Sequence, residues 1–365
     1  MAKKKNTKGL IITLVILIII VLACAGAYIA IQLSNGKPIF YIDRGDGNQT
    51  SGTMVVEKKT VQIYKGTDRP IAVMIDNNEE AMPHGGINKA YLIYEIVVEG
   101  GETRLMALFK GQDVSKIGPV RSARHYFLDY ALENDAIYVH FGWSPQAESD
   151  ISTIGVNNIN GIFESEDAFW RTSDKYAPHN VATETSEILK IAKEKGYRTT
   201  SEVTSVLNYT TDEVNLENGK SCTEITIPFP SSKVKWTYDE ESKTYSRVSK
   251  GIEATDWETG EDYSAKNIII TFIENSTLYD GEGKDRQTMT TTGTKDGYYI
   301  TNGKVIPITC TKNTRSSKTV YKDLEGNEIK VNDGNTFIEI VSPRVDVTME
   351  GESEVETNTN SVDVD

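Results

Sequence analysis

The chain has 365 residues, of which 53 are acidic and 39 are basic, and its formal net charge is −14. The four charged residues among the first 33 are all lysines, so the rest of the chain carries a charge of −18. A surface this acidic repels nucleic acid and anionic lipid, which excludes a general nucleic-acid-binding role and confines any anion binding to a local site.

Cysteine and histidine are scarce. The chain has three cysteines and four histidines, and it contains neither an HExxH nor a CxxC motif. This is too little for a disulfide scaffold or a structural zinc site, so we expect no metal and no cofactor. Cys222 and Cys310 fit either one bridge outside the membrane or two separate thiols, and the sequence leaves both alternatives open.

The N-terminus predicts a membrane tether. Residues 10–33 form an almost unbroken apolar run of 24 residues, longer than the roughly 20 that a helix needs to cross a bilayer. Lysines at positions 3, 4, 5 and 8 predict that the N-terminus lies inside and the bulk of the chain outside the cell membrane. The alternative is a lipoprotein signal, because Val21-Leu22-Ala23-Cys24 resembles a lipobox. The retained helix is favoured because the hydrophobicity continues beyond Cys24.

Two further segments lack any regular period. Residues 34–60 are rich in Gly, Asn, Thr and charge, which is typical of a flexible stalk. Residues 344–365 are dominated by Glu, Asp, Thr, Asn and Val, and we expect a disordered acidic tail there.

Residues 61–209 predict a first folded body. Strand-like apolar runs stand at 71–75, 91–98, 104–109 and 137–141. A helical pattern covers 183–196, with Thr183 as the expected N-cap and Gly196 as the stop. A second helical pattern covers 120–133, directly after Pro119, a residue that suits the first turn of a helix. These elements together favour a mixed sheet with helices packed on it.

The start of the second predicted helix is unusually basic. Helical spacing places Arg121, Arg124 and His125 on one face of its first turns. Cations there oppose the helix macrodipole, so a negative partner is needed. An internal carboxylate, Glu95 or Glu99, would serve, and so would an anionic ligand bound to the free helix N–H groups. The sequence does not decide between them.

Other polar residues stand at turn-like positions. His140 and Ser144 end the fourth predicted strand in VHFGWSP, and His179 and Asn180 lie in the loop KYAPHNVAT after Arg171. A serine and two histidines suggest a hydrolase, but the chain has no GxSxG elbow. Ser144 before Pro145 is more typical of a helix cap, and Asn180 of a turn.

Residues 226–343 predict a second folded segment, whose pattern is one of short strands and turns. Short β-prone runs stand at 234–238, 245–248, 267–273, 298–301, 304–309, 319–321 and 336–341, with hairpin connectors at 301–304 and 324–327. We therefore expect an α+β chain: an N-terminal mixed sheet with packed helices, then a mainly antiparallel β domain. Asp280, Glu282 and Asp285 are spaced somewhat like calcium ligands, but a solvated turn explains them better.

Several motifs carry a family resemblance. Along the chain, these are RPIAVMIDNN from Arg69, VVEGGETRLMALF from Val97, IGPVRSARHYFLDYALENDAIYVHFGWSPQA from Ile117 and APHN from Ala177. Together they resemble the YerB-like family of bacterial lipoproteins, whose function is unknown. The resemblance implies a membrane-tethered, envelope-facing protein of two domains. The matching polar positions are Arg104, Arg121, Ser122, Arg124, His140, Ser144, His179 and Asn180.

The leading hypothesis is an extracytoplasmic binding protein for an envelope component that carries a carboxylate or a phosphate. Arginine suits such groups because its planar fork donates two parallel hydrogen bonds. One alternative is an envelope hydrolase with His140 or His179 as base and Glu95 or Glu99 in support. Another is an interaction module that docks an envelope protein partner. The expected ligand-binding set is Arg104, Arg121, Ser122, Arg124, His125, His140, Ser144, His179, Asn180 and Glu99.

Overall fold

The structure is a computed structural model that describes residues 59–351. The predicted anchor (1–33), all but the last two residues of the predicted stalk and residues 352–365 of the predicted tail lie outside this range. Within residues 59–351, no helix is both long and apolar enough to span a bilayer.

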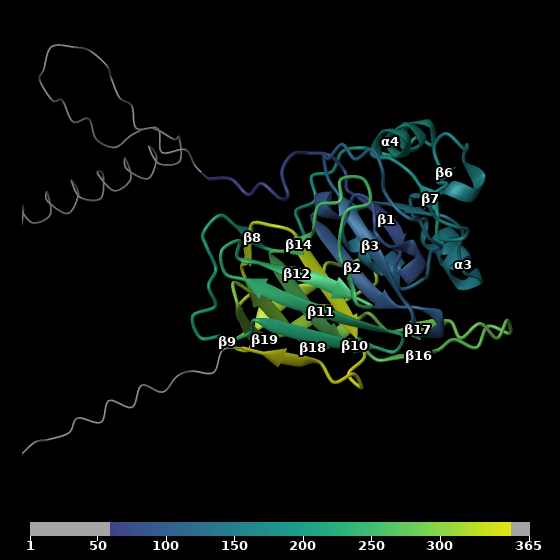
Figure 1. Cartoon of the computed structure of the whole chain (residues 1–365). Coiled ribbons are helices and arrows are strands. Elements are labelled where there is room, and N and C mark those ends of the chain that lie inside the picture. Colours follow the sequence, from purple (N-terminus) through teal and green to yellow (C-terminus); the bar gives the residue numbers. More distant parts are fainter. Residues whose placement is uncertain (1–58, 352–365) are drawn as a thin grey trace, which may run out of the picture. The chain divides into compact units, whose positions relative to one another are not determined.

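One large mixed sheet of 11 strands runs through the molecule (Figure 1). Its strand order is β20-β19-β18-β15-β22-β2-β3-β1-β4-β5, and β9 pairs with β19. The N-terminal segment supplies β1 (Ile71–Asp76), β2 (Leu92–Val97), β3 (Thr103–Phe109), β4 (Ile137–His140) and β5 (Asn158–Asn160). The rest supplies β9 (Lys220–Ser221), β15 (Asn267–Phe272), β18 (Gly293–Thr301), β19 (Lys304–Lys312), β20 (Val320–Asp323) and β22 (Thr336–Val341).

The central strands are buried on both faces. Every residue of β1, β2 and β3 is buried, which explains why these strands read as continuous apolar runs and not as alternating ones. Alternate residues of β1 belong to different cores: Val73 and Ile75 face one, and Met74 faces the other. The sheet is therefore the middle layer of the fold.

A second sheet and one helix cover the first face. Ile225, Val234, Trp236 and Tyr245 of this sheet share a core with Val73. Its six strands are β10 (Glu224–Phe229), β11 (Ser232–Asp239), β12 (Thr244–Ser249), β13 (Ile252–Glu253), β14 (Ser264–Ala265) and β23 (Thr348–Glu350). The helix α4 (Thr185–Glu194) packs on the same core through Ile188, Ile191 and Ala192.

Two helices cover the opposite face: α2 (Phe127–Glu133) and α3 (Pro145–Ile154). Short 3₁₀ turns are η1 (Glu79–Ala81), η2 (Ile87–Lys89), η3 (Glu99–Gly101) and η4 (Gly161–Phe163). Three small ladders complete the described residues: β6 (Trp170–Arg171) with β7 (Val181–Ala182), β8 (Tyr209–Thr210) with β21 (Val331–Asn332), and β16 (Asn275–Thr277) with β17 (Gln287–Met289).

The fold is predominantly β with some helices, which agrees broadly with the expected α+β class. The four strands predicted in the N-terminal segment and the strands predicted after residue 226 are present. The segments 61–209 and 226–343 share one sheet, because β2 pairs in parallel with β22. Their division into two domains stays a prediction.

The predicted helix at 120–133 was wrong at its start, because α2 begins only at Phe127. The preceding residues are extended and paired with neighbouring strands. Val120 donates its N–H to the Val181 carbonyl at 2.7 Å, and Arg121 donates its N–H to the Met74 carbonyl at 2.9 Å. Tertiary pairing therefore outweighs the local helical pattern. Because Arg121 and Arg124 precede the first residue of α2, the helix-macrodipole argument does not apply to them.

Two cap predictions had different outcomes. Ser144 is the N-cap of α3, and its side chain accepts a hydrogen bond of 3.3 Å from the Ala147 N–H. Thr183 does not cap α4. Its hydroxyl instead donates to the Ala168 carbonyl at 2.8 Å, and Glu184 occupies the N-cap position without a side-chain hydrogen bond.

The C-terminal segment also differs from expectation in one place. Thr348–Glu350, predicted as part of the disordered tail, form β23 and pair with β10. Val345, Val347 and Met349 pack on the core, so alternating apolar residues give this strand its inward face. Cys222 and Cys310 are separate, buried thiols, and burial raises the pKa of each to about 12.

Candidate functional site

Two arginines of the predicted cluster are held by an internal carboxylate. Arg124 Nε donates to Glu99 Oε2 at 2.9 Å, and Arg104 NH2 lies 3.3 Å from Glu99 Oε1. Arg104 also donates to the Ser122 carbonyl at 2.5 Å. Each arginine side chain is only 7% exposed. Burial would raise the pKa of Glu99, but the hydrogen bond from Arg124 and the charge of Arg104 lower it to about 2. The internal carboxylate is thus the partner of these two arginines.

Arg121 lies apart from this pair, at a different carboxylate. Its Nε is 3.1 Å from Asp76 Oδ2, at the end of β1. His179 Nδ1 is 2.7 Å from the same oxygen. Asp76 is buried, whereas the Arg121 side chain is 24% exposed. Asp76 therefore orients both Arg121 and His179.

The other predicted site residues have structural contacts. His140 is fully buried, with Nδ1 2.8 Å from the Gly142 carbonyl and Nε2 3.2 Å from Asn158 Oδ1. Burial lowers the pKa of His140 to about 4, so the ring is neutral at pH 7. His125 Nε2 lies 3.1 Å from Thr288 Oγ1, and burial lowers the pKa of His125 as well. These histidines do not meet Glu99 in a common site.

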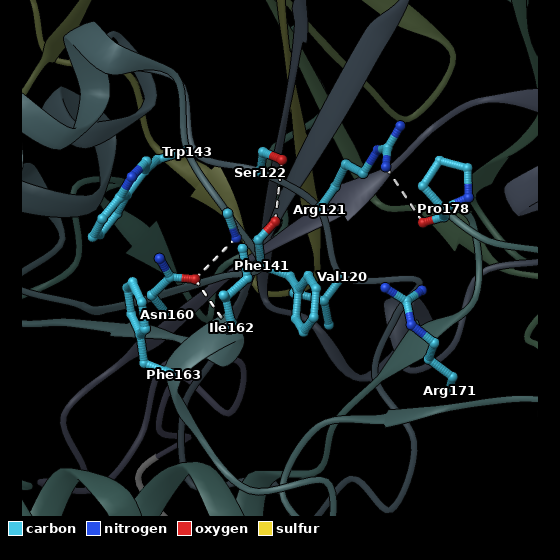
Figure 2. A pocket seen from close by; sticks show the side chains of 11 residues that line it. Val120, Arg121, Ser122, Phe141, Trp143, Asn160, Ile162, Phe163, Arg171 and Pro178 are labelled. Atoms are coloured by element: carbon cyan, nitrogen blue, oxygen red, sulfur yellow. Dashed lines mark hydrogen bonds between the residues drawn. The ribbon is translucent and has the colours of Figure 1, made fainter.

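An open cleft of about 460 Å³ lies beside the β4–β5 edge of the large sheet (Figure 2). Of the predicted set, Arg121 and Ser122 line it. The remaining lining residues are Val120, Phe141, Gly142, Trp143, Asn160, Ile162, Phe163, Arg171 and Pro178. The cleft is built from the extended segment 120–122, the residues that follow β4, the end of β5 with the turn η4, and β6 with the loop that contains His179.

Arg121 and Arg171 stand on one side of the cleft and the Trp143 and Phe163 rings on the other (Figure 2). The Arg171 guanidinium is 5.5 Å from the centre of the Phe141 ring, close enough for a cation–π contact. Trp143 and Phe163 have ring centres 5.7 Å apart, and Phe163 is 72% exposed. Aromatic rings together with a few charged donors are a lining that ligand sites favour.

Asn180 fixes one of these arginines. Its Oδ1 accepts a hydrogen bond of 2.7 Å from Arg171 NH1, and its Nδ2 donates to the Thr172 carbonyl at 3.0 Å. Asn180 is itself buried. The predicted motif residue therefore serves the cleft indirectly, by positioning Arg171.

Sequence reasoning missed most of the cleft. Phe141 and Trp143 adjoin the predicted strand end, so their position was a usable signal. Asn160 and Phe163 belong to NINGIF, which has no helical or strand period and gave no signal. Arg171 was noted only as the residue that precedes a loop.

Within residues 59–351, no group of three or more His, Cys, Asp or Glu side chains is arranged to hold a metal ion. The acidic residues around position 280 belong to local pairs. Arg286 pairs with Asp280 and with Glu282, the latter at 2.8 Å, and Thr277 Oγ1 donates to Asp285 Oδ1 at 2.8 Å.

These features define a predominantly β protein with a few helices and an open cleft lined by arginine and aromatic side chains. Residues 56–198 match the family described as "Protein of unknown function (DUF3048) N-terminal domain", and residues 225–338 match the C-terminal domain of the same family. "Putative lipoprotein YerB" of Bacillus subtilis (strain 168) is 32% identical over 270 residues, which are 73% of this chain and 76% of that protein.

A solved structure is also similar. The crystal structure of YerB protein from Bacillus subtilis matches with a TM-score of 0.69 and 29% identity, covering 77% of this chain and 94% of that one. The chain belongs to the YerB-like family, which confirms the resemblance seen in the sequence motifs.

Proposed function

We propose that this chain is a membrane-tethered, outward-facing protein that binds an anionic component of the cell envelope in the cleft beside β4 and β5. The observation that carries the proposal is that Arg121 and Arg171, from separate segments, flank one aromatic-lined cleft. The apolar run at 10–33 and the lipoprotein name of the relative support the tether.

The two arginines are pre-oriented for an anion. Asp76 faces Nε of Arg121, and Arg121 NH1 is only loosely engaged, 3.4 Å from the Pro178 carbonyl. Arg171 uses NH1 for Asn180. Because a guanidinium has five N–H donors, each side chain keeps further donors for a carboxylate or phosphate. Fixing the arginines beforehand reduces the entropy lost when the ligand binds.

Arg104 and Arg124 are not part of this proposed site. They stay with Glu99 and are nearly inaccessible, so binding an external anion there would require breaking a buried ion pair. The proposed site therefore keeps Arg121 from the predicted cluster and gains Arg171.

The test measures binding of two anionic probes to the full-length protein in detergent: a soluble disaccharide-peptide from bacterial cell wall and a glycerol-phosphate oligomer. The double variant Arg121→Gln/Arg171→Gln is expected to weaken binding of the preferred probe by tenfold or more, since charge-assisted hydrogen bonds contribute about 1.5–3 kcal/mol each. Arg344→Gln is the matched control, because Arg344 is exposed and does not line the cleft. Unchanged affinity in the double variant would refute the proposal.

A second candidate is hydrolysis with His179 as general base. The specific observation is the 2.7 Å contact between Asp76 Oδ2 and His179 Nδ1, which orients the ring as a carboxylate does in catalytic dyads. The expected support from Glu95 or Glu99 is replaced by Asp76, because Glu95 pairs with Arg247 and Glu99 pairs with the buried arginines. Release of fragments from cell-wall glycan, lost in His179→Gln, would favour hydrolysis. Equal release by His179→Gln would exclude it.

A further inference from the structure

A second cleft adjoins the first. It also measures about 460 Å³ and is lined by residues of α3, β5, η4 and the segment that follows α4. Both clefts share Trp143, Asn160 and Phe163. These three residues form the partition between the clefts, and the two clefts together, here called the groove, extend beyond the size of a single small anion.

The partition contains an unpartnered donor. Asn160 is 5% exposed, and its Oδ1 accepts hydrogen bonds from the backbone N–H groups of Gly142 at 2.9 Å and Ile162 at 3.2 Å. Its Nδ2 is buried and has no partner among the described residues. Buried polar groups are nearly always paired, so such a donor between two clefts indicates an absent acceptor.

The chemistry of the groove is graded along its length. Arg121 and Arg171 supply cationic donors at one end, and the Trp143 and Phe163 rings stand beside Asn160 at the partition. At the far end Lys195 already pairs with Glu164 at 2.9 Å. The ligand that fits has an anionic group, then a ring with an apolar face and an acceptor oxygen, then a neutral polar extension.

We propose that the groove binds a glycan strand built from N-acylated sugars, of which one carries a peptide that ends in a carboxylate. This inference rests on the proposed function and names its ligand class. The carboxylate binds Arg121 and Arg171, the C–H face of the sugar ring packs on Phe163 and Trp143, and the acyl carbonyl accepts from Asn160 Nδ2. The adjoining cleft holds the next sugar.

Access to Asn160 requires a local movement. Because Nδ2 is buried, the acyl carbonyl reaches it only after a neighbouring ring shifts. Phe163 is the ring able to shift, since it is 72% exposed and lies in the short turn η4. Its displacement joins the two clefts into a single groove.

The experiment compares three probes on the full-length protein in detergent: the disaccharide-peptide, the stem peptide without sugar, and an uncharged N-acetylglucosamine trimer. The disaccharide-peptide is expected to bind at least tenfold more tightly than either of the others. Phe163→Ala should reduce the ratio of disaccharide-peptide to stem-peptide affinity by fivefold or more. The matched control is Tyr279→Ala, an aromatic residue that is 94% exposed and outside both clefts, and it should keep the wild-type ratio.

Asn160→Asp provides the second variant, because it keeps the acceptor for Gly142 and Ile162 but removes the donor. Its affinity for the uncharged trimer should fall at least fivefold, and the added charge does not oppose that probe. A stem peptide that binds as tightly as the disaccharide-peptide would overturn the glycan groove and leave the anion site standing. Wild-type affinities for all probes in Arg121→Gln/Arg171→Gln would overturn both proposals.

Discussion

Glu95 of β2 lies directly opposite Glu339 of β22 in the parallel strand pair that joins the N-terminal and C-terminal segments, and both side chains are fully buried. Arg247 NH2 is 2.5 Å from Glu95 Oε2, and Trp236 Nε1 donates to Glu339 Oε1 at 3.0 Å. Burial, together with the neighbouring charge of Glu95, raises the pKa of Glu339 well above its ordinary value. The junction therefore holds one ion pair and one neutral carboxyl group.

Replacing Glu339 with Gln tests this arrangement. Because the folded-state pKa is raised, the stability contributed by Glu339 is fully present below pH ~4.5 and is lost as the pH rises through the folded-state pKa. Glu339→Gln removes this loss, so the variant should gain stability relative to the wild type as the pH increases from 5 to 8. Urea unfolding at both pH values measures the difference.

Arg247→Met is the contrasting variant at the same junction. It leaves Glu95 buried without its cation, so we expect a loss of about 3–5 kcal/mol at pH 7. A Glu339→Gln variant as unstable as Arg247→Met would show that Glu339 is ionised in the folded protein, contrary to the arrangement described above.

A substitution of Glu99 tests whether Arg104 and Arg124 serve only the fold and take no part in the cleft. The pKa of Glu99 is lowered to about 2, so its stability contribution is present above pH ~4.5 and is lost as the pH falls through about 2. Glu99→Gln leaves Arg104 and Arg124 without a counter-charge, and we expect a loss of about 3 kcal/mol at pH 7 and a flatter acid limb. Thermal melts between pH 2 and 7 measure both effects.

The same variant has a binding readout. If Arg104 and Arg124 serve only the fold, Glu99→Gln protein that remains folded should bind the anionic probes with wild-type affinity. Affinity that increases tenfold on release of these arginines would instead place the anion site at Glu99.

The strands were predicted well from the sequence, because burial on both faces gives β1, β2 and β3 continuous apolar runs. The start of α2 was misplaced, because residues 120–123 have a helical pattern but pair with distant segments of the chain. The β2–β22 pairing joins segments far apart in the chain, and no local pattern encodes it.

In the candidate site, too, local sequence patterns predict some features and the tertiary fold decides the others. An arginine looks alike in sequence whether it holds an internal carboxylate, as Arg124 does, or lines a cleft, as Arg121 does. Burial decides between these roles, and burial depends on the tertiary fold. Phe163 joins the cleft from a 3₁₀ turn, an element too short to leave a periodic signal.

The buried histidines predict a loss of stability in mild acid. Burial, and to a lesser degree the charge of Arg247, lowers the pKa of His84 to about 3, and burial lowers that of His140 to about 4. Because the folded-state values lie below the unfolded value of ~6.5, stability is full above that pH and declines as the pH falls toward the folded-state values. Between the unfolded-state and the folded-state pKa values, each ring should lower the free energy of unfolding by up to about 1.4 kcal/mol for every pH unit.

Chemical unfolding at pH 7.5 and 5.5 measures that decline. Nuclear magnetic resonance of the imidazole carbons provides the residue-specific control, since the rings of His84 and His140 should remain neutral at pH 5.5. A midpoint near pH 6.5 for either ring would show that burial does not suppress its protonation.

Substitutions of Ser144 distinguish two roles for the VHFGWSP motif: capping of α3 or participation in the chemistry of the site. The Ser144 side chain caps α3 by accepting from the Ala147 N–H, so Ser144→Ala should lower the free energy of unfolding by about 1 kcal/mol. Ser144→Asp should restore most of this loss, because aspartate caps helix N-termini equally well. Neither variant should change probe affinity or glycan release. Loss of either activity in Ser144→Ala at unchanged stability would instead make Ser144 a participant in the chemistry of the site.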